Sequence, residues 1–427
     1  IVVPHRLICP RGPVFFCHGI TGNFVLFATR AASSATHMFP VRYVQLCRLT
    51  MAWHRILDDV PYLFQKIRMD HENRRYKLAG RGSSSNHAGR FEAFAVAAVD
   101  DGWEGDAEPL PVLRTEVRLE VPRSVITYNK SPDLPFDRSI NPYRGCEHGC
   151  VYCFARPSHA YLGLSPGLDF ETRLIARPDA PDVLRRELAA KRYNVAPIAI
   201  GTNTDPYQPI ESEHQIMRGL LQVLSDANHP VAIVTKGSLI ERDIDILADM
   251  AKRGLVRVGI SVTTLDAKLA RLMEPRVPAP KRRLQVIHAL SQAGIPVRVM
   301  ASPMVPALTD PELEAILEAG RDAGARSASW IMLRLPREVS QLMQDWLAQH
   351  YPDRAGRIMA RLREMHGGKE YDAQWHRRMR GEGPYAEIIQ QRFKLAVKRL
   401  GLATLSPPMR CDLFRPPKMA SAQLDLF

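Results

Sequence analysis

Short apolar runs alternate with helical patterns along the middle of the chain. A short continuous apolar run is typical of a strand buried on both faces, whereas apolar residues at i, i+3, i+4 and i+7 are typical of an amphipathic helix. The runs predict strands at residues 197–201, 231–234, 256–262, 295–300 and 329–333. The helical patterns between them predict helices over residues 217–224, 240–251, 281–293 and 311–323.

This alternation predicts a parallel sheet, because strands separated by single helices are joined by right-handed crossovers. A presumed first strand near residues 139–143 brings the count to about six repeats, which predicts an α/β fold with an open, partial TIM-type barrel. The functional site of such a barrel lies at the carboxyl ends of its strands, where the strand-to-helix loops converge.

The chain beyond residue 340 is helical in pattern and basic. One apolar stripe there consists of Ile389, Phe393, Ala396, Val397 and Leu400, and it lies opposite Arg392, Lys394, Lys398 and Arg399. Such a helix either packs on the barrel with a solvated basic face or contacts nucleic acid. We therefore divide the chain into an N-terminal extension (69–130), a core barrel (131–340), a helical basic extension (341–405) and a proline-rich tail (406–427).

Residues 1–68 differ from the rest of the chain. They contain eight basic but only two acidic residues and show no sustained period, and Met69 opens a segment of ordinary composition. We interpret residues 1–68 as sequence translated from a misplaced start, or as a disordered leader; a basic targeting peptide is the alternative. Residues 80–90, rich in glycine and serine, are expected to form a flexible basic loop.

The net charge of +13 favours a polyanionic partner such as nucleic acid. The hydrophobic fraction of 45% and the charged fraction of 24% are ordinary for a globular protein. The chain has no apolar run long enough to span a bilayer, so we predict a cytoplasmic protein without a membrane partner.

Three of the seven cysteines form a C-x3-C-x2-C run at Cys146, Cys150 and Cys153. Three thiolates this close can ligate three irons of a [4Fe–4S] cluster and leave the fourth iron open, whereas electron-transfer clusters use four cysteines. An open iron indicates chemistry rather than electron storage. Zinc is the alternative metal, with His148 or His159 as a fourth ligand.

The cysteine run, with aromatic Tyr152 before the third cysteine, resembles the hallmark of the radical S-adenosylmethionine (SAM) superfamily. The resemblance implies a [4Fe–4S] cluster whose open iron binds SAM through its amino and carboxylate groups. Reductive cleavage of SAM would then yield methionine and a 5′-deoxyadenosyl radical, which abstracts a hydrogen atom from the substrate. It also implies an electron donor of the flavodoxin or ferredoxin type.

A second constellation, residues 201–211, follows a predicted strand and is rich in hydroxyl, amide and carboxylate groups. Such groups can hold an ammonium group and fix a cofactor. The segment resembles the spore photoproduct lyase-like branch of the superfamily, often described as DNA repair photolyases. The match implies SAM-pocket roles for Thr202, Asn203, Thr204 and Asp205. Ser261 and Thr263 are further candidate SAM contacts, and Lys236 could pair with a carboxylate or a substrate phosphate.

The chain departs from that branch in one respect. Spore photoproduct lyases carry a further cysteine that returns a hydrogen atom to the product radical, but here no cysteine lies between Cys153 and Cys411. We therefore predict a radical SAM enzyme of lyase-like or DNA-repair type, whose hydrogen-atom donor the sequence does not identify. The alternatives are a radical SAM enzyme acting on RNA, a peptide or a small molecule, and a non-enzymatic zinc-bearing nucleic-acid-binding protein.

The last five residues, QLDLF, resemble the motif that binds the bacterial sliding clamp. The resemblance implies that Gln423, Leu424, Leu426 and Phe427 enter a groove on the clamp, with the apolar side chains as anchors. Docking of this apolar terminus onto its own domain is the alternative.

Overall fold

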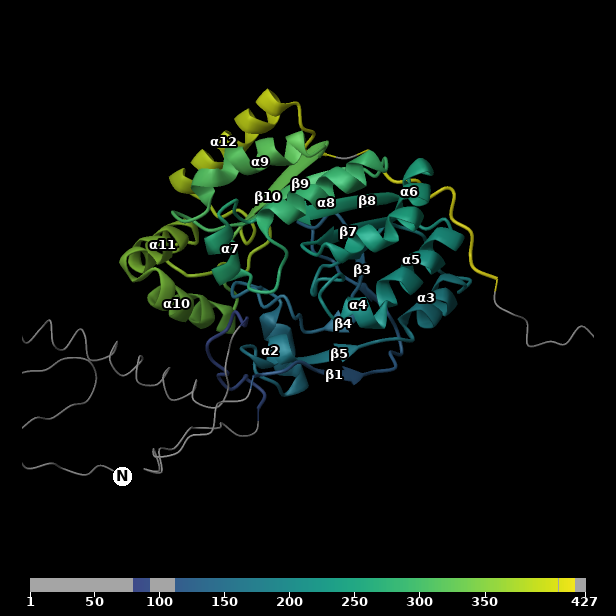
Figure 1. Cartoon of the computed structure of the whole chain (residues 1–427), viewed down its shortest axis with the longest axis horizontal. Coiled ribbons are helices and arrows are strands. Elements are labelled where there is room, and N and C mark those ends of the chain that lie inside the picture. The colour runs from purple at the N-terminus through teal and green to yellow at the C-terminus, as the bar shows by residue number, and fades with distance from the viewer. Residues whose placement is uncertain (1–79, 93–111, 406, 419–427) are drawn as a thin grey trace, which may run out of the picture. The chain divides into compact units, whose positions relative to one another are not determined.

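The computed structural model describes residues 80–92, 112–405 and 407–418 (Figure 1). The predictions for residues 1–68 and for the QLDLF segment lie outside these residues. None of the described helices is long and apolar enough to cross a membrane. The cytoplasmic location stays a prediction.

The main sheet has seven strands in the order β10-β9-β8-β7-β6-β3-β2. They are β2 (Ile126–Tyr128), β3 (Arg138–Ile140), β6 (Ile198–Ile200), β7 (Val231–Thr235), β8 (Val256–Ser261), β9 (Val297–Met304) and β10 (Ser327–Met332). All neighbours from β3 to β10 pair in parallel, and only β2 runs antiparallel at one edge. The predicted α/β fold with an open, partial barrel is therefore confirmed.

Helices connect the successive parallel strands and cover one face of the sheet (Figure 1). They are α5 (Ile216–Asp226), η3 (Leu239–Asp243) with α6 (Ile244–Lys252), α8 (Pro280–Gln292), and η4 (Asp310–Glu312) with α9 (Leu313–Asp322). The helix-facing side chains of the sheet are large and buried, as at Ile233, Val258 and Val299. The opposite face carries the intervening residues, among them Gly259, where a Cβ atom would lie 2.7 Å from Met300 Sδ. The absence of a side chain at Gly259 leaves room for the Met300 side chain on this face.

A second, three-stranded sheet was not predicted. It joins β1 (Glu116–Leu119), β5 (Arg173–Ala176) and β4 (Tyr143–Arg144). Short helices accompany it: η2 (Arg156–Leu162), α2 (Asp169–Thr172) and α3 (Ala180–Leu188), while α4 (Glu211–His214) and α7 (Ala267–Met273) follow later strands of the main sheet. Strands of two to four residues are too short to show a periodic pattern of apolar and polar positions, so the sequence did not reveal them.

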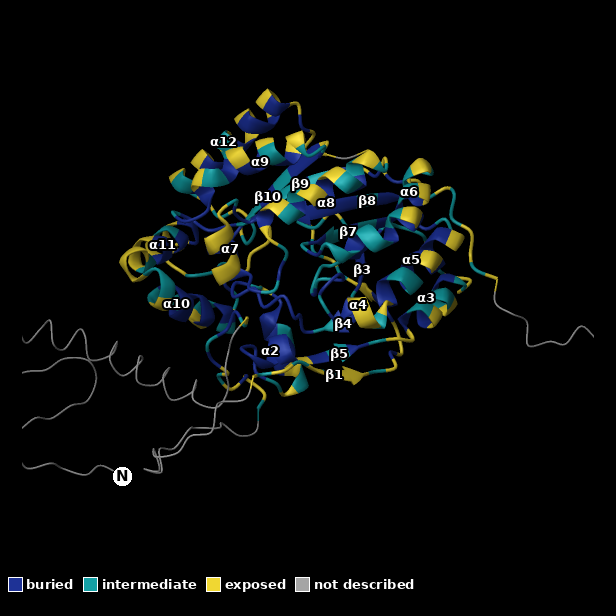
Figure 2. Ribbon diagram, viewed as in Figure 1, coloured by how far each residue is buried: buried dark blue, intermediate teal, exposed yellow. Residues whose placement is uncertain are grey.

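The helical extension consists of α10 (Glu338–His350), α11 (Pro352–Met365) and α12 (Pro384–Leu400). The predicted apolar stripe of α12 is buried (Figure 2) and packs against α9. Arg392, expected on a solvated face, instead forms an ion pair with Glu314 of α9 at 2.5 Å. The remaining basic residues of α12, Lys394, Lys398 and Arg399, are exposed.

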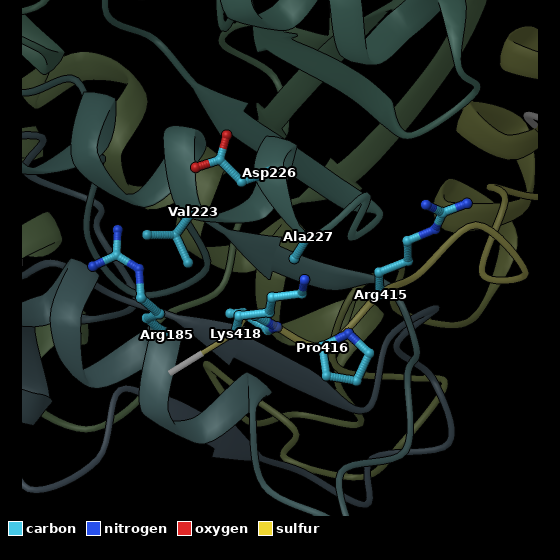
Figure 3. Close-up of a pocket in the computed structure, with 8 residues that line it drawn as sticks. Arg185, Val223, Asp226, Ala227, Arg415, Pro416 and Lys418 are labelled. Atoms are coloured by element: carbon cyan, nitrogen blue, oxygen red, sulfur yellow. The ribbon is translucent and has the colours of Figure 1, made fainter. Parts of the chain in front are cut away.

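Residues 402–405 and 407–418, which we call the belt, cross the amino ends of the parallel strands (Figure 1). Ala403 bridges to Ser327 at the start of β10, the Arg410 N–H donates to the Gly254 carbonyl before β8, and the Arg415 N–H donates to the Ala227 carbonyl before β7. Where the belt passes α3 and α5, a cavity of about 270 Å³ lies between them (Figure 3). It is lined by Arg185, Val223, Asp226, Ala227, Arg415, Pro416, Pro417 and Lys418.

His229 lies buried under the belt, with its ring edge against Phe414. Its Nε2 is 2.7 Å from the Tyr193 hydroxyl and its Nδ1 is 3.0 Å from the Pro230 carbonyl. The neutral tautomer with a proton on Nδ1 satisfies both contacts, whereas a second proton on Nε2 would require Tyr193 to accept rather than donate. Burial, reinforced by nearby Arg138, lowers the pKa of His229 from 6.5 to about 4.

We expect the free energy of unfolding to fall as the pH drops from 6.5 towards 4. In this range His229 binds a proton in the unfolded chain but not in the folded protein. Above pH 6.5 the two states bind equally few protons, so the contribution is fully present there. The loss attributable to His229 is about 3 kcal/mol at most. Urea unfolding at several pH values should show that the free energy of unfolding falls less steeply below pH 6.5 in His229→Asn than in the wild type. The same change at exposed His288 on α8 should leave the wild-type slope.

Candidate active site

The three cysteines lie in the loop between β4 and η2, beyond the carboxyl ends of the barrel strands. The loop turns at Gly145 and Gly149, which adopt φ angles of +77° and +68°. A side chain at Gly145 would meet Leu174 at 2.6 Å and one at Gly149 would meet the Glu171 carboxylate at 2.8 Å. Both turns therefore require glycine, for conformation and for space.

Cys146 and Cys150 are buried, Cys153 is half-buried, and none of them forms a disulfide. Burial raises the pKa of the Cys146 thiol well above its usual value, and the neighbouring Asp205, Cys150 and Cys153 raise it further. Burial likewise raises the pKa of Cys150 to about 12, despite the opposing effect of Lys236. Thiolates crowded in this way are stable only beside a strong positive charge, and iron supplies that charge. The residues thus fit an iron–sulfur cluster.

Within the described ranges, no three His, Cys, Asp or Glu side chains gather as they would around a single metal ion. The two histidines considered as zinc ligands have other partners. His148 Nδ1 is 3.3 Å from the Asp205 carboxylate, and His159 Nε2 is 2.9 Å from the Arg173 carbonyl.

The completely buried side chain of Arg156 forms hydrogen bonds with the backbone of the cysteine loop. Its Nε donates to the Cys150 carbonyl at 3.0 Å, and one Nη donates to the Gly149 carbonyl at 3.3 Å. The same guanidinium forms an ion pair with buried Glu171. Loop carbonyls that would otherwise be unsatisfied thus share one cation, whose charge is balanced by one carboxylate.

Glu171 also fixes the segment 80–92 over the cysteine loop. The Gly82 and Ser83 N–H groups each donate to its carboxylate at 2.9 Å. The backbones come so close that a Cβ atom at Gly82 would lie 1.7 Å from the Gly149 carbonyl oxygen. The expectation of a flexible basic loop over residues 80–90 is therefore wrong: this segment is a packed cover, because its glycine and serine residues allow close backbone approach.

Asp205 joins the cysteine loop to the ends of two strands. It accepts hydrogen bonds from the Thr235 hydroxyl at 2.6 Å and the Lys236 N–H at 2.8 Å, both at the end of β7, and it contacts His148. Burial raises its pKa, but the charge and hydrogen bond of His148 and the hydrogen bonds from Thr235 and Lys236 outweigh it and bring the pKa to about 2. The described contacts of this carboxylate are thus internal and position the loop.

The other predicted SAM residues surround the same loop. The Thr204 hydroxyl donates to the Tyr143 carbonyl at 3.1 Å, and the Asn203 N–H donates to Asn141 at 3.0 Å. Thr202 is half-buried beside them, and Ser261 is buried at the end of β8. Thr263 lies 3.2 Å from the Tyr152 hydroxyl. The structure therefore brings residues from two separate predicted segments to the cysteine loop.

Sequence reasoning missed the buried network around Glu274. This carboxylate accepts hydrogen bonds from Tyr152 and from Thr263, the latter at 2.8 Å, and forms an ion pair with Arg283. Burial raises the pKa of Glu274, but Arg283 and Lys236 lower it more, so the carboxylate is anionic. One signal was available: Arg283 lies within the buried stripe of α8, whose other members are Pro280, Val286, Ile287 and Leu290. A cation in an apolar stripe indicates a buried partner.

Lys236 extends this network towards the cysteines. Its ammonium lies 5.9 Å from the centre of the Tyr152 ring. Burial lowers the pKa of Lys236, but Cys150 and Glu274 raise it more, so the side chain stays charged. Glu274 is near enough to raise the pKa of Lys236, but the pairing of Lys236 with a carboxylate or a substrate phosphate stays a prediction.

The Radical SAM superfamily model matches residues 140–320. An uncharacterized protein of Mycobacterium tuberculosis is 37% identical over 243 residues, which cover 56% of this chain and 70% of the relative. An uncharacterized protein of Methanocaldococcus jannaschii is 25% identical over 215 residues, covering 50% of this chain and 76% of the relative. A solved structure of spore photoproduct lyase complexed with dinucleoside spore photoproduct aligns with 71% of this chain and 86% of that chain, at 14% identity and a TM-score of 0.46.

Replacing Arg156 with methionine should loosen the cysteine loop, because it leaves the Glu171 carboxylate buried without its cation. We expect a loss of about 3–5 kcal/mol in the free energy of unfolding, together with a lower iron content after anaerobic purification. Arg173→Met is the matched control, since Arg173 is half exposed and its contact with Asp169 is 3.6 Å. That control should cost less than about 1 kcal/mol. Similar losses in the two variants would contradict the role of Arg156.

Proposed function

Because this chain belongs to the radical SAM superfamily, whose members use a [4Fe–4S] cluster and SAM, we propose that Cys146, Cys150 and Cys153 ligate the cluster and leave one iron open for SAM. The observation that carries this proposal is the gathering of three free, crowded thiols in one rigid loop beyond the carboxyl ends of the strands. The family also favours this centre over the zinc alternative.

SAM bound at such a cluster supplies a 5′-deoxyadenosyl radical that abstracts a hydrogen atom. The protein has to orient the cofactor and keep water out. Arg156 and Glu171 hold the loop that carries the thiols, and the segment 80–92 covers it. Lys236 places a positive charge near Cys150, which partly offsets the negative charge of the thiolates.

The proposed SAM residues fall into two groups. Thr204, Asp205 and Thr263 use their described side-chain hydrogen bonds within the protein, so we assign them to positioning the loop and the strand ends. Thr202, Asn203 and Ser261 are the candidates for direct SAM contacts. Their place at the ends of β6 and β8 supports this assignment.

We propose nucleic acid as the substrate, supported by the basic net charge, which is +13 for the whole chain and +7 without residues 1–68. Cys411 is a poor candidate for returning a hydrogen atom to a product radical. It lies in the belt at the amino ends of the strands, whereas the cysteine loop lies beyond their carboxyl ends. A DNA-repair or lyase-like reaction would thus use another donor, and RNA, peptide and small-molecule substrates are the alternatives.

Electron paramagnetic resonance of the dithionite-reduced, anaerobically purified protein tests the cofactor assignment. We expect a reduced-cluster signal that shifts when SAM is added, because SAM coordinates the open iron. Cys153→Ala should lose the signal, and Cys411→Ala should keep both the signal and the shift. A cluster signal indifferent to SAM, or zinc in place of iron, would overturn the proposal.

We also propose that the last residues bind a bacterial sliding clamp. The belt is hydrogen-bonded to the barrel as far as Arg415, and Gln423, Leu424, Leu426 and Phe427 follow a few residues later in the chain. Immobilised clamp should retain the wild-type protein but lose most binding when Leu424 and Phe427 are both replaced by alanine, since these side chains are the proposed anchors. The control replaces exposed Leu395 and Leu405 with alanine and should bind as the wild type. Equal retention of both double variants would refute clamp binding through this motif.

A further inference from the structure

Two arginine–aromatic pairs lie next to the cysteine loop. Phe154 directly follows Cys153 and is 44% exposed, and the guanidinium of Arg334 lies 4.6 Å from the centre of its ring. Tyr161 is 67% exposed, the guanidinium of Arg90 lies 5.7 Å from the centre of its ring, and nearby Arg337 lowers its pKa. Each pair thus presents an open aromatic ring beside a cation.

The same two segments of the chain supply both pairs. Phe154 and Tyr161 lie at the two ends of the η2 region, whereas Arg334 and Arg337 lie three residues apart between β10 and α10. The pairs therefore lie along the same two segments of the chain, starting beside the third cysteine. Phe91, 57% exposed, extends this group, with its ring centre 5.2 Å from that of Tyr161. We call these three aromatic and two basic residues the aromatic strip.

The strip has features of a binding surface rather than of a packed core. Single exposed aromatic residues are common, but here the exposed rings of Phe91 and Tyr161 lie together and exposed Phe154 belongs to the same segment as Tyr161, and such a grouping indicates a function. In the part of the chain that the structure describes, neither Arg334 nor Arg337 has a carboxylate partner within 4 Å, and the buried Nε of Arg334 has no hydrogen-bond acceptor. Adjacent Arg90, by contrast, forms an ion pair with Glu338 at 2.6 Å and also lies over the Phe91 and Tyr161 rings.

We propose that the aromatic strip binds unpaired nucleotides and delivers one of them to the cysteine loop; this rests on the proposed radical SAM function with a nucleic-acid substrate. Exposed rings offer faces on which bases stack, and Arg334 and Arg337 offer charges for phosphates. In a duplex the base faces are already stacked, so the strip selects single strands or extruded bases over intact duplex. Phe154 is the innermost ring, because it adjoins a proposed cluster ligand.

Fluorescence anisotropy with a labelled oligothymidine strand tests this inference on the cluster-loaded full chain. We expect Tyr161→Ala and Arg334→Gln each to weaken binding about tenfold, because one stacked base is worth about 1–3 kcal/mol. Tyr161→Phe should bind as the wild type, since stacking needs the ring and not the hydroxyl. The controls on exposed positions of α12, Leu395→Ala and Arg399→Gln, remove similar apolar surface or charge and should change affinity less than about twofold.

Competition experiments decide the class of occupant. An unlabelled single strand should displace the probe at far lower concentrations than a blunt duplex of the same sequence or a polyglutamate peptide. Equal competition by the duplex, tighter binding of the peptide, or unchanged affinity in Tyr161→Ala and Arg334→Gln would overturn the proposal. The SAM-dependent resonance shift in the same samples separates this failure from failure of the radical SAM function, because that shift depends on the cluster and not on the strip.

Discussion

The buried contact between Arg156 and Glu171 is the interaction on which the rest of the site depends. The loop that offers three thiols within a few residues turns at two glycines and leaves backbone carbonyl groups that need buried hydrogen-bond donors. Arg156 satisfies two of these carbonyl oxygens, those of Gly149 and Cys150, and two more after η2, those of Pro166 and Gly167. Glu171 balances the charge and binds the covering segment. Loop geometry and cover therefore depend on a single ion pair.

Two further carboxylates repeat this arrangement on the barrel side. Asp205 connects the cysteine loop to β7, and Glu274 connects it to β8 and α8. Glu274 is buried and Asp205 is largely so, and both stay anionic because each has a cation or several donors close by. A cluster ligated by thiolates adds negative charge to this region, so cations such as Lys236 have to remain near it. Positive and negative side chains thus alternate around the site, and each of these carboxylates has a cation or hydrogen-bond donors beside it.

The sequence was sufficient for the framework because the framework repeats. Apolar runs and helical stripes placed the parallel strands and their helices, and the close spacing of Cys146, Cys150 and Cys153 located the site. The ion pairs could not be predicted, because Arg156 and Glu171 read as ordinary surface residues until the fold buries them. Asp205 shows a subtler limit: its segment was recognised, but only the contacts with Thr235 and Lys236 distinguish positioning a loop from binding a cofactor.

The two ends of the barrel have different roles: the amino ends contribute stability, and the carboxyl ends carry the candidate site. At the amino ends the belt covers buried His229 with its half-buried Phe414, and its hydrogen bonds cross several strands. At the carboxyl ends the described side chains instead surround the cysteine loop and continue into the exposed aromatic strip. Closing the amino ends with the chain's own backbone frees the loops at the opposite end from holding the sheet together. Those loops can then carry exposed rings and half-buried cations, which lower stability but provide a surface for a polyanion.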